Sequence, residues 1–123
     1  MSYTGIVIRE SLTNTVVLDS LELIKREVEK VDADMNTPWL DIWTLDQVRV
    51  TDDQIDVVCQ QLSQVIDDSH CDDWYLDLRN DDWLYVVFKN KVFKIDRHNP
   101  ASYEVMKAYA IAHHLPEYQL PEP

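Results

Sequence analysis

The chain has 123 residues, of which 46% are hydrophobic, and a formal net charge of −12 at pH 7. A chain of this length is typical of one domain, and its hydrophobic content argues against disorder despite the charge. Because binding to phosphates needs a dominant basic face, the composition also argues against a nucleic-acid ligand. We therefore expect a single domain spanning residues 1–123 that does not bind nucleic acid.

The sequence contains no targeting or membrane signal. The first ten residues, MSYTGIVIRE, lack the basic start and apolar run of a secretory signal, and no stretch approaches the roughly 18 apolar residues of a membrane span. The two cysteines, Cys59 and Cys71, fit a reducing compartment in which both thiols are free. These features predict a soluble cytoplasmic protein that does not bind a membrane.

The first half of the chain begins with a predicted strand over residues 2–10, where β-branched residues follow Gly5. The segment 21–31, LELIKREVEKV, is ambiguous, because its apolar residues fit one side of a helix as well as a strand. After a break at Pro38, the segment 42–50 reads as a strand.

A helix is predicted over residues 52–67, because apolar residues recur there at helical spacing. Thr51 and Gln54 have the spacing of a capping box at its start. Cys59 falls on the apolar side of this helix, which favours a buried structural thiol over a nucleophile.

Three strands separated by short turns follow, with the sequences WYLDLR, WLYVVF and KVFKID. Strand alternation places Tyr75, Asp77 and Arg79 on one face of this meander, while both faces of the middle strand are apolar. A last helix is predicted over residues 100–114, with Asn99 as its cap. Its predicted apolar side consists of Val105, Met106, Tyr109 and Ala112 or His113. The fold class that results is α+β: a mainly antiparallel sheet of five or six strands with two principal helices.

The segment 67–73, DDSHCDD, collects side chains that bind divalent metals. Zinc fits poorly, because His70 and Cys71 are adjacent and no second cysteine pair exists. Oxygen ligands for Mg²⁺, Mn²⁺ or Ca²⁺ fit better, and the candidate ligands are Asp67, Asp68, His70, Asp72 and Asp73. A solvated acidic loop between a helix and a strand is the favoured interpretation.

Several other chemistries find no support. Asp32, Asp34 and Asn36 are spaced like the first ligands of an EF-hand loop, but the glycine and the closing glutamate of that motif are missing. Gly5 is the only glycine, which excludes the glycine-rich phosphate-binding loops. We predict no catalytic residues and no cofactor.

Two features suggest an interaction surface. The stretch from Asp52 to Asp82 contains ten aspartates and a single basic residue, Arg79, so it carries most of the net charge. Such a charge steers a basic partner or simply keeps the protein soluble. Tyr75, Asp77 and Arg79 form a polar row that suits contact with a ligand or partner, or an edge strand with one solvated side.

The segments SYTGIVIRESL, TPWL followed by WTL, WYLDLRND, FKNKVFKIDR and PEYQ together resemble a family of small bacterial proteins of no established activity. This resemblance implies a stand-alone cytoplasmic protein of about this length and a strand at residues 21–31. It supplies no functional residues.

The function predicted from these observations is a non-enzymatic protein-interaction module with an acidic surface. Its partner would be a basic protein or a second copy of the chain, and acidic mimicry of nucleic acid is one version of this role. The alternative is a divalent-metal-dependent hydrolase or small-ligand binder that uses the acidic 67–73 segment.

Overall fold

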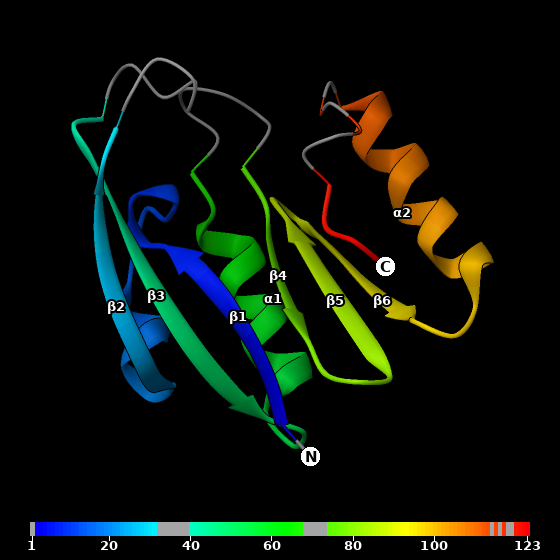
Figure 1. The fold of residues 1–123 in the computed structure, drawn as a ribbon, viewed down its shortest axis with the longest axis horizontal. Helices are drawn as coiled ribbons and strands as arrows, with labels where there is room; N and C mark the ends of the chain where they lie inside the picture. The colour runs from blue at the N-terminus through cyan, green and yellow to red at the C-terminus, as the bar shows by residue number, and fades with distance from the viewer. Residues whose placement is uncertain (1, 32–39, 68–73, 114, 116, 118–119) are drawn as a thin grey trace.

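The structure is a computed structural model, and it describes residues 2–31, 40–67, 74–113, 115, 117 and 120–123. The described residues form one six-stranded antiparallel sheet with two α-helices and two short 3₁₀ segments (Figure 1). The elements in chain order are β1 (Ser2–Ile8), η1 (Arg9–Ser11), η2 (Val16–Ser20), β2 (Glu22–Lys30), β3 (Ile42–Thr51), α1 (Ile55–Val65), β4 (Leu76–Arg79), β5 (Trp83–Phe88), β6 (Lys91–Asp96) and α2 (Pro100–Ala112). The predicted α+β class is confirmed.

The strand order is β2-β3-β1-β4-β5-β6, so the sheet consists of two three-stranded halves. We call β2, β3 and β1 the open half and β4, β5 and β6 the covered half. The halves join where β1 pairs with β4, with Thr4 opposite Arg79. A Cβ atom on the neighbouring Gly5 would overlap the Asp77 carbonyl oxygen. The two backbones therefore approach this closely only because Gly5 has no side chain.

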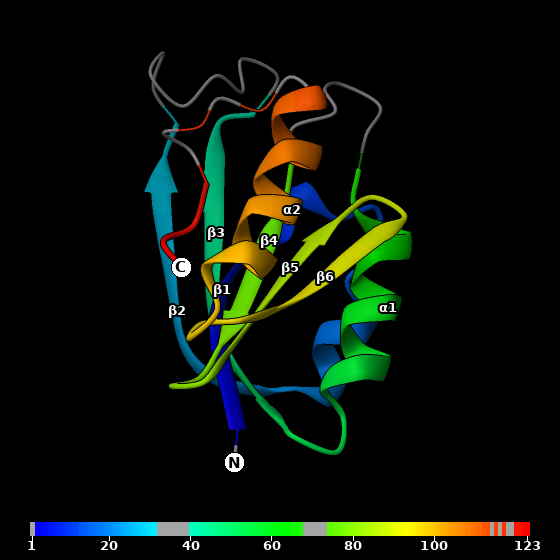
Figure 2. The same ribbon diagram turned by 90° about the vertical axis from the view of Figure 1, so that its right-hand side faces the viewer.

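Helix α1 covers one face of the sheet along both halves, together with η2 (Figure 2). Residues at alternate positions of the strands point to this side, including Tyr3 and Val7 of β1, Val48 of β3 and Leu78 of β4, and all four are buried. The apolar side of α1, with Cys59 and Leu62 fully buried, packs against them. This core joins the two halves into one structure.

Helix α2 covers the other face, but only over the covered half (Figures 1 and 2). Leu84, Val86 and Phe88 of β5 are buried there against Met106 and Ala110 of α2. The middle strand β5 is therefore buried on both faces, as its sequence predicted. Neither of the two described helices lies on the same face of the open half.

The predicted meander is confirmed, including the face that carries Tyr75, Asp77 and Arg79, because Asp77 pairs with Val86 and Arg79 with Leu84. The ambiguous segment 21–31 is the strand β2, as the family resemblance implied. The first strand ends at Ile8, since the chain turns into η1 there.

Two details of the predicted helices are wrong. Helix α1 begins at Ile55 and has no side-chain cap; the Thr51 hydroxyl donates to the Gln54 side chain, while residues 52–54 form a turn. On α2, Met106 is buried as predicted, but Val105 is exposed and the second buried position is Ala110. The Asn99 cap is confirmed, because its side chain accepts a hydrogen bond from the Ala101 amide.

Candidate functional site

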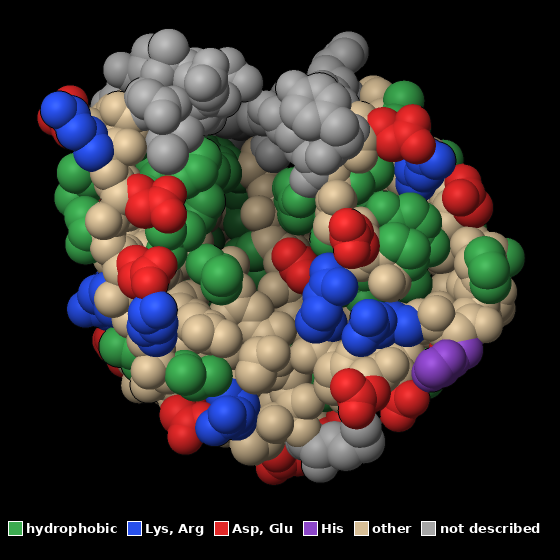
Figure 3. Space-filling view, in the orientation of Figure 1, with side chains coloured by type: hydrophobic (Ala, Val, Ile, Leu, Met, Phe, Trp, Pro, Cys, Tyr) green, Lys and Arg blue, Asp and Glu red, His purple; other side chains and the backbone are tan. Residues whose placement is uncertain are grey.

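The uncovered face of the open half is a hollow in the molecular surface. β2 curls towards the side on which α2 lies, so that β1 and β3 form the floor between β2 and α2 (Figure 2). Figure 3 shows this hollow, with apolar side chains gathered on the side of β2 and β3. The strand register places the following residues on this face: Thr4, Ile6 and Ile8 of β1, and Leu45, Gln47 and Arg49 of β3.

The apolar residues in the hollow are partly exposed to solvent. Ile6, in the middle of the floor, is 55% exposed, whereas Val7 next to it on the α1 side is fully buried. Leu45 and Ile8, which pair across β1 and β3, are half-buried. A contiguous exposed apolar surface with a polar border is typical of a binding site.

The polar row predicted on β4 borders this hollow. Asp77 and Arg79 bind each other, with Nη2 of Arg79 3.0 Å from Oδ2 of Asp77, and each side chain is 29% exposed. Tyr75 packs on Phe88, with 5.9 Å between ring centroids, and burial raises the pKa of its phenol to about 12, with a further contribution from Asp77. The structure thus brings the three predicted residues together at the boundary between the two halves.

The described aspartates of the stretch from Asp52 to Asp82 do not lie together in the molecule. Asp52 accepts a hydrogen bond from the Tyr3 hydroxyl and Asp56 accepts one from the Tyr85 hydroxyl, so both lie at the end of the sheet where β1 starts. The β4–β5 turn, which contains Asp81 and Asp82, lies at this same end (Figure 1). Asp67 lies at the opposite end of α1, where its amide donates to the Ser11 carbonyl. The ten aspartates therefore cannot form one patch.

The metal prediction depends on residues that the structure does not describe. Of the five candidate ligands, Asp68, His70, Asp72 and Asp73 lie outside the described residues, and Asp67 lies inside them. The EF-hand look-alike at residues 32–36 is also outside. Elsewhere, the described part of the chain contains no group of three or more histidine, cysteine or acidic side chains placed to hold a metal ion.

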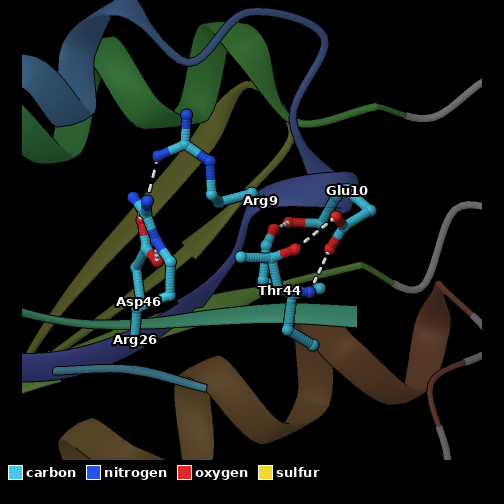
Figure 4. A network of polar contacts seen from close by, with 7 residues as sticks. Arg9, Glu10, Arg26, Thr44 and Asp46 are labelled. Carbon is cyan, nitrogen blue, oxygen red and sulfur yellow. Dashed lines mark hydrogen bonds and ion pairs between the residues drawn. The ribbon is translucent and has the colours of Figure 1, made fainter. Parts of the chain in front are cut away.

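A buried charge cluster lies under the open half and was not predicted. Asp46 of β3 is 1% exposed, and its carboxylate lies between the guanidinium groups of Arg9 and Arg26 (Figure 4). Arg26 contacts it through Nε at 2.6 Å and Nη2 at 3.0 Å, and Arg9 contacts it at 2.9 Å. The hydrogen bonds from Arg26 lower the pKa of Asp46, burial opposes this effect, and the hydrogen bond from Arg9 adds to it. The cluster holds β2 and η1 on β3.

A second carboxylate, that of Glu10, accepts hydrogen bonds from β3 close to the strand's N-terminal end. The Thr44 amide and hydroxyl both donate to Glu10 (Figure 4). Pairing between β1 and β3 ends at Ile8 and Leu45, so Glu10 accepts the hydrogen bond that a longer β1 would have accepted. The alternation Thr44, Asp46, Val48, Val50 in the sequence was the available signal, because it places an aspartate on the buried side of a strand.

The remaining candidates are structural. Cys59 is fully buried, and burial raises the pKa of its thiol to about 12, so it is not a nucleophile in the folded protein. Lys94 lies over the Trp83 ring at 4.5 Å, and Lys89 donates to the Gln64 carbonyl. These two lysines are thus engaged in contacts within the chain.

Comparison of the chain with family models, with curated proteins and with solved structures finds no match. Membership of the small bacterial family that the sequence resembles therefore stays a prediction. No helix among the described residues is long and apolar enough to cross a membrane.

Proposed function

We propose that the protein is a non-enzymatic interaction module that binds a protein partner in the hollow of the open half. One observation carries this proposal: the face that α2 buries over the covered half is left exposed over β1 and β3, with apolar Ile6 in the middle of it. A sheet face that carries apolar side chains and is not covered by a helix suits contact with a second macromolecule.

The partner's chemistry follows from the border of the hollow. The apolar floor suits one or more apolar side chains, and the ion pairs Arg49–Glu22 and Asp77–Arg79 offer polar contacts around it. The net charge of −12 attracts a partner of positive charge from a distance. A basic protein segment with exposed apolar residues fits both features. The metal-dependent alternative rests on residues 68–73, and no observation on the described residues favours it.

The proposal is tested by quantitative affinity capture with three forms of the protein. Ile6→Lys places a charge on the floor of the hollow, and Val57→Lys places the same charge on the solvent side of α1, where Val57 is 61% exposed. We expect the same basic partner to be retained by the wild-type protein and by Val57→Lys, and to be lost with Ile6→Lys. Retention should also fall as salt screens the charges.

Two outcomes contradict the proposal. Equal retention by all three forms would mean that the hollow does not bind the partner, and the absence of any stoichiometric partner would leave the surface without one. Thermal unfolding of both lysine variants is the control, because each must remain folded for the comparison to count.

A further inference from the structure

The outer edge of β2 is a second candidate surface, separate from the hollow. Among the described strands, β2 is an edge strand of the sheet, is nine residues long, and has every residue exposed. The opposite edge strand, β6, has six residues and packs against α2. An edge strand leaves a row of backbone amides and carbonyls free to pair with another strand, unless its side chains prevent this. The side chains of β2 therefore decide whether this edge is blocked or pairs.

The charges of β2 cancel although the chain as a whole is strongly acidic. Its three glutamates are matched by three basic residues, and the sequence is ELIKREVEK. A protein with a net charge of −12 repels its own copies over most of its surface. Contact between two copies at the β2 edge would be free of this local repulsion.

The order of these charges is complementary to itself in one antiparallel register. When two β2 strands are centred on Arg26, Lys25 lies opposite Glu27 of the second copy, in the regular part of the strand that follows the bulge between Leu23 and Lys25. This pair occurs twice because the arrangement is two-fold symmetric.

The neighbouring registers are unfavourable. Centring the pair on Lys25 or on Glu27 places that residue opposite its own copy, and both charges are exposed. Centring on Val28 places Glu27 opposite Glu29 of the second copy. Like charges directly opposite each other destabilise a pair of strands, so among the registers centred on residues 25–28 the charge pattern favours the one centred on Arg26.

The two Arg26 residues at the centre of this register do not repel strongly, since each is already paired within its own chain. Two of its nitrogens contact the buried Asp46 carboxylate, on the α1 side of the sheet. Lys25 and Glu27 lie on the opposite side, where they contact each other at 2.6 Å. Between Leu23 and Lys25 the pairing with β3 has a bulge, so Lys25, Arg26 and Glu27 form a regular centre outside it.

We propose that two copies of the chain associate through antiparallel pairing of their β2 edges in the register centred on Arg26. The two six-stranded sheets become one continuous sheet. The occupant of this edge is a second copy because β2 offers both the backbone groups of an edge strand and the self-complementary charges that such a copy needs. This inference goes beyond the proposed function, because it concerns the edge of β2 and does not require a partner in the hollow.

The test uses the full chain in sedimentation velocity over a concentration series, at about 0.15 M salt, where charge repulsion extends only about 8 Å. We expect the wild-type protein to form a species of twice the chain mass. Lys25→Glu and Glu27→Lys each turn two attractive contacts into repulsive ones, so each variant alone should dissociate roughly ten times more readily.

Mixing provides the decisive result. In a mixed pair, the two introduced charges have opposite signs and face each other at one contact, while the native Glu27 faces the native Lys25 at the other. Equimolar Lys25→Glu and Glu27→Lys should therefore form a heterodimer as stable as the wild-type pair. The double variant Lys25→Glu/Glu27→Lys should dimerise on its own, because both of its contacts join opposite charges. Lys91→Glu, on the opposite edge strand β6, is the matched control and should leave the dimer unchanged.

Three results would overturn the inference. The first is a wild-type protein that stays monomeric at all concentrations, and the second is a dimer that persists in both single charge-reversal variants. The third is a failure of the mixed variants to associate although circular dichroism shows them folded. None of these results bears on capture by the hollow, which the Ile6→Lys comparison measures separately.

Discussion

The two halves of the sheet have the same number of strands and the same antiparallel pairing, but they are buried differently. In the covered half, β5 lies between α1 and α2, and five of its six residues are buried. In the open half, β2 has no buried residue, and β3 and β1 are buried on the α1 side alone. One face of the open half therefore contributes little to the core, and such surface is where binding sites are found.

The halves also differ in what holds their outer strands. In the covered half, β6 is held by apolar contacts of Ile95 and Phe93 with the cluster under α2. In the open half, β2 is held on β3 by the ladder of backbone hydrogen bonds and by the ion pair of Arg26 with Asp46. The open half therefore depends more on polar contacts, and it should respond more to pH.

The greatest loss of stability is expected at the joint between the halves. Gly5→Val places side-chain atoms where the Asp77 carbonyl and Leu78 already lie, so β1 and β4 must separate. We expect a loss of about 3 kcal/mol in the free energy of unfolding, measured by urea titration with tryptophan fluorescence. Thr4→Val, one residue earlier on the partly exposed side, is the control and should change stability by less than about 0.5 kcal/mol. Equal stability of the two variants would show that the halves are not joined through this contact.

A second pair of variants contrasts the same face of the two halves. Met106→Ala removes a fully buried side chain between α2 and β5, and we expect a loss of about 3 kcal/mol. Ile6→Ala removes a half-exposed side chain from the hollow and should cost about 0.5 kcal/mol. Urea unfolding measures both. A loss for Ile6→Ala as large as that for Met106→Ala would show that the hollow is covered in solution.

A third prediction concerns the buried carboxylate. Asp46→Asn leaves Arg9 and Arg26 without their anion, and we expect a loss of about 2 kcal/mol at pH 7. Because folding lowers the pKa of Asp46, its charged form stabilises the protein above the unfolded pKa of about 4, and this contribution is lost as pH falls through the folded value. The difference between wild type and Asp46→Asn, measured by urea unfolding at each pH, should therefore shrink as pH decreases below about 4.

The control for this pH dependence is Glu22→Gln, which removes an ion pair whose two side chains are both about half exposed. It should cost less than about 0.5 kcal/mol at any pH. A constant difference between Asp46→Asn and wild type from neutral to strongly acidic pH would contradict the assignment of the effect to the Asp46 charge.

A small change in stability is expected at the boundary of the hollow. Asp77→Asn breaks the partly exposed pair with Arg79 and should cost less than about 1 kcal/mol in stability. If the row on β4 contacts the partner, the same variant should weaken capture of that partner clearly. Thermal unfolding and quantitative capture on the same sample separate the two effects, and a large loss of stability without loss of capture would make the row structural.

Sequence periodicity predicted those helices and strands that bury one or both faces against the core. The alternation in β4, β5 and β6 and the helical spacing around Cys59 correspond to faces that lie against the core. The segment 21–31 gave no clear pattern because β2 is exposed on both faces, so nothing selected one set of alternate positions for apolar residues. Its identity as a strand depends on pairing with β3, which lies beyond the connection 31–41.

The site was predicted only in part, for a similar reason. Alternation alone put Tyr75, Asp77 and Arg79 on one face, but the extent of α2 over that face depends on tertiary packing. Predicting the hollow would have required the strand order, in which β1 lies between β3 and β4. The capping box at Thr51 failed because the chain forms a turn over residues 52–54 before the helix starts, and Asp52 bonds with Tyr3 in that turn.

The central position of β1 affects the order of folding. The meander of β4, β5 and β6 consists of neighbours in the sequence, and β2 pairs with β3, the next strand, so both units close comparatively short loops. β1 pairs with residues as distant as Arg79, and contacts between distant residues form slowly. We expect the strand nearest the N-terminus to be the last one inserted. Until then, the two units expose the edges that β1 later joins.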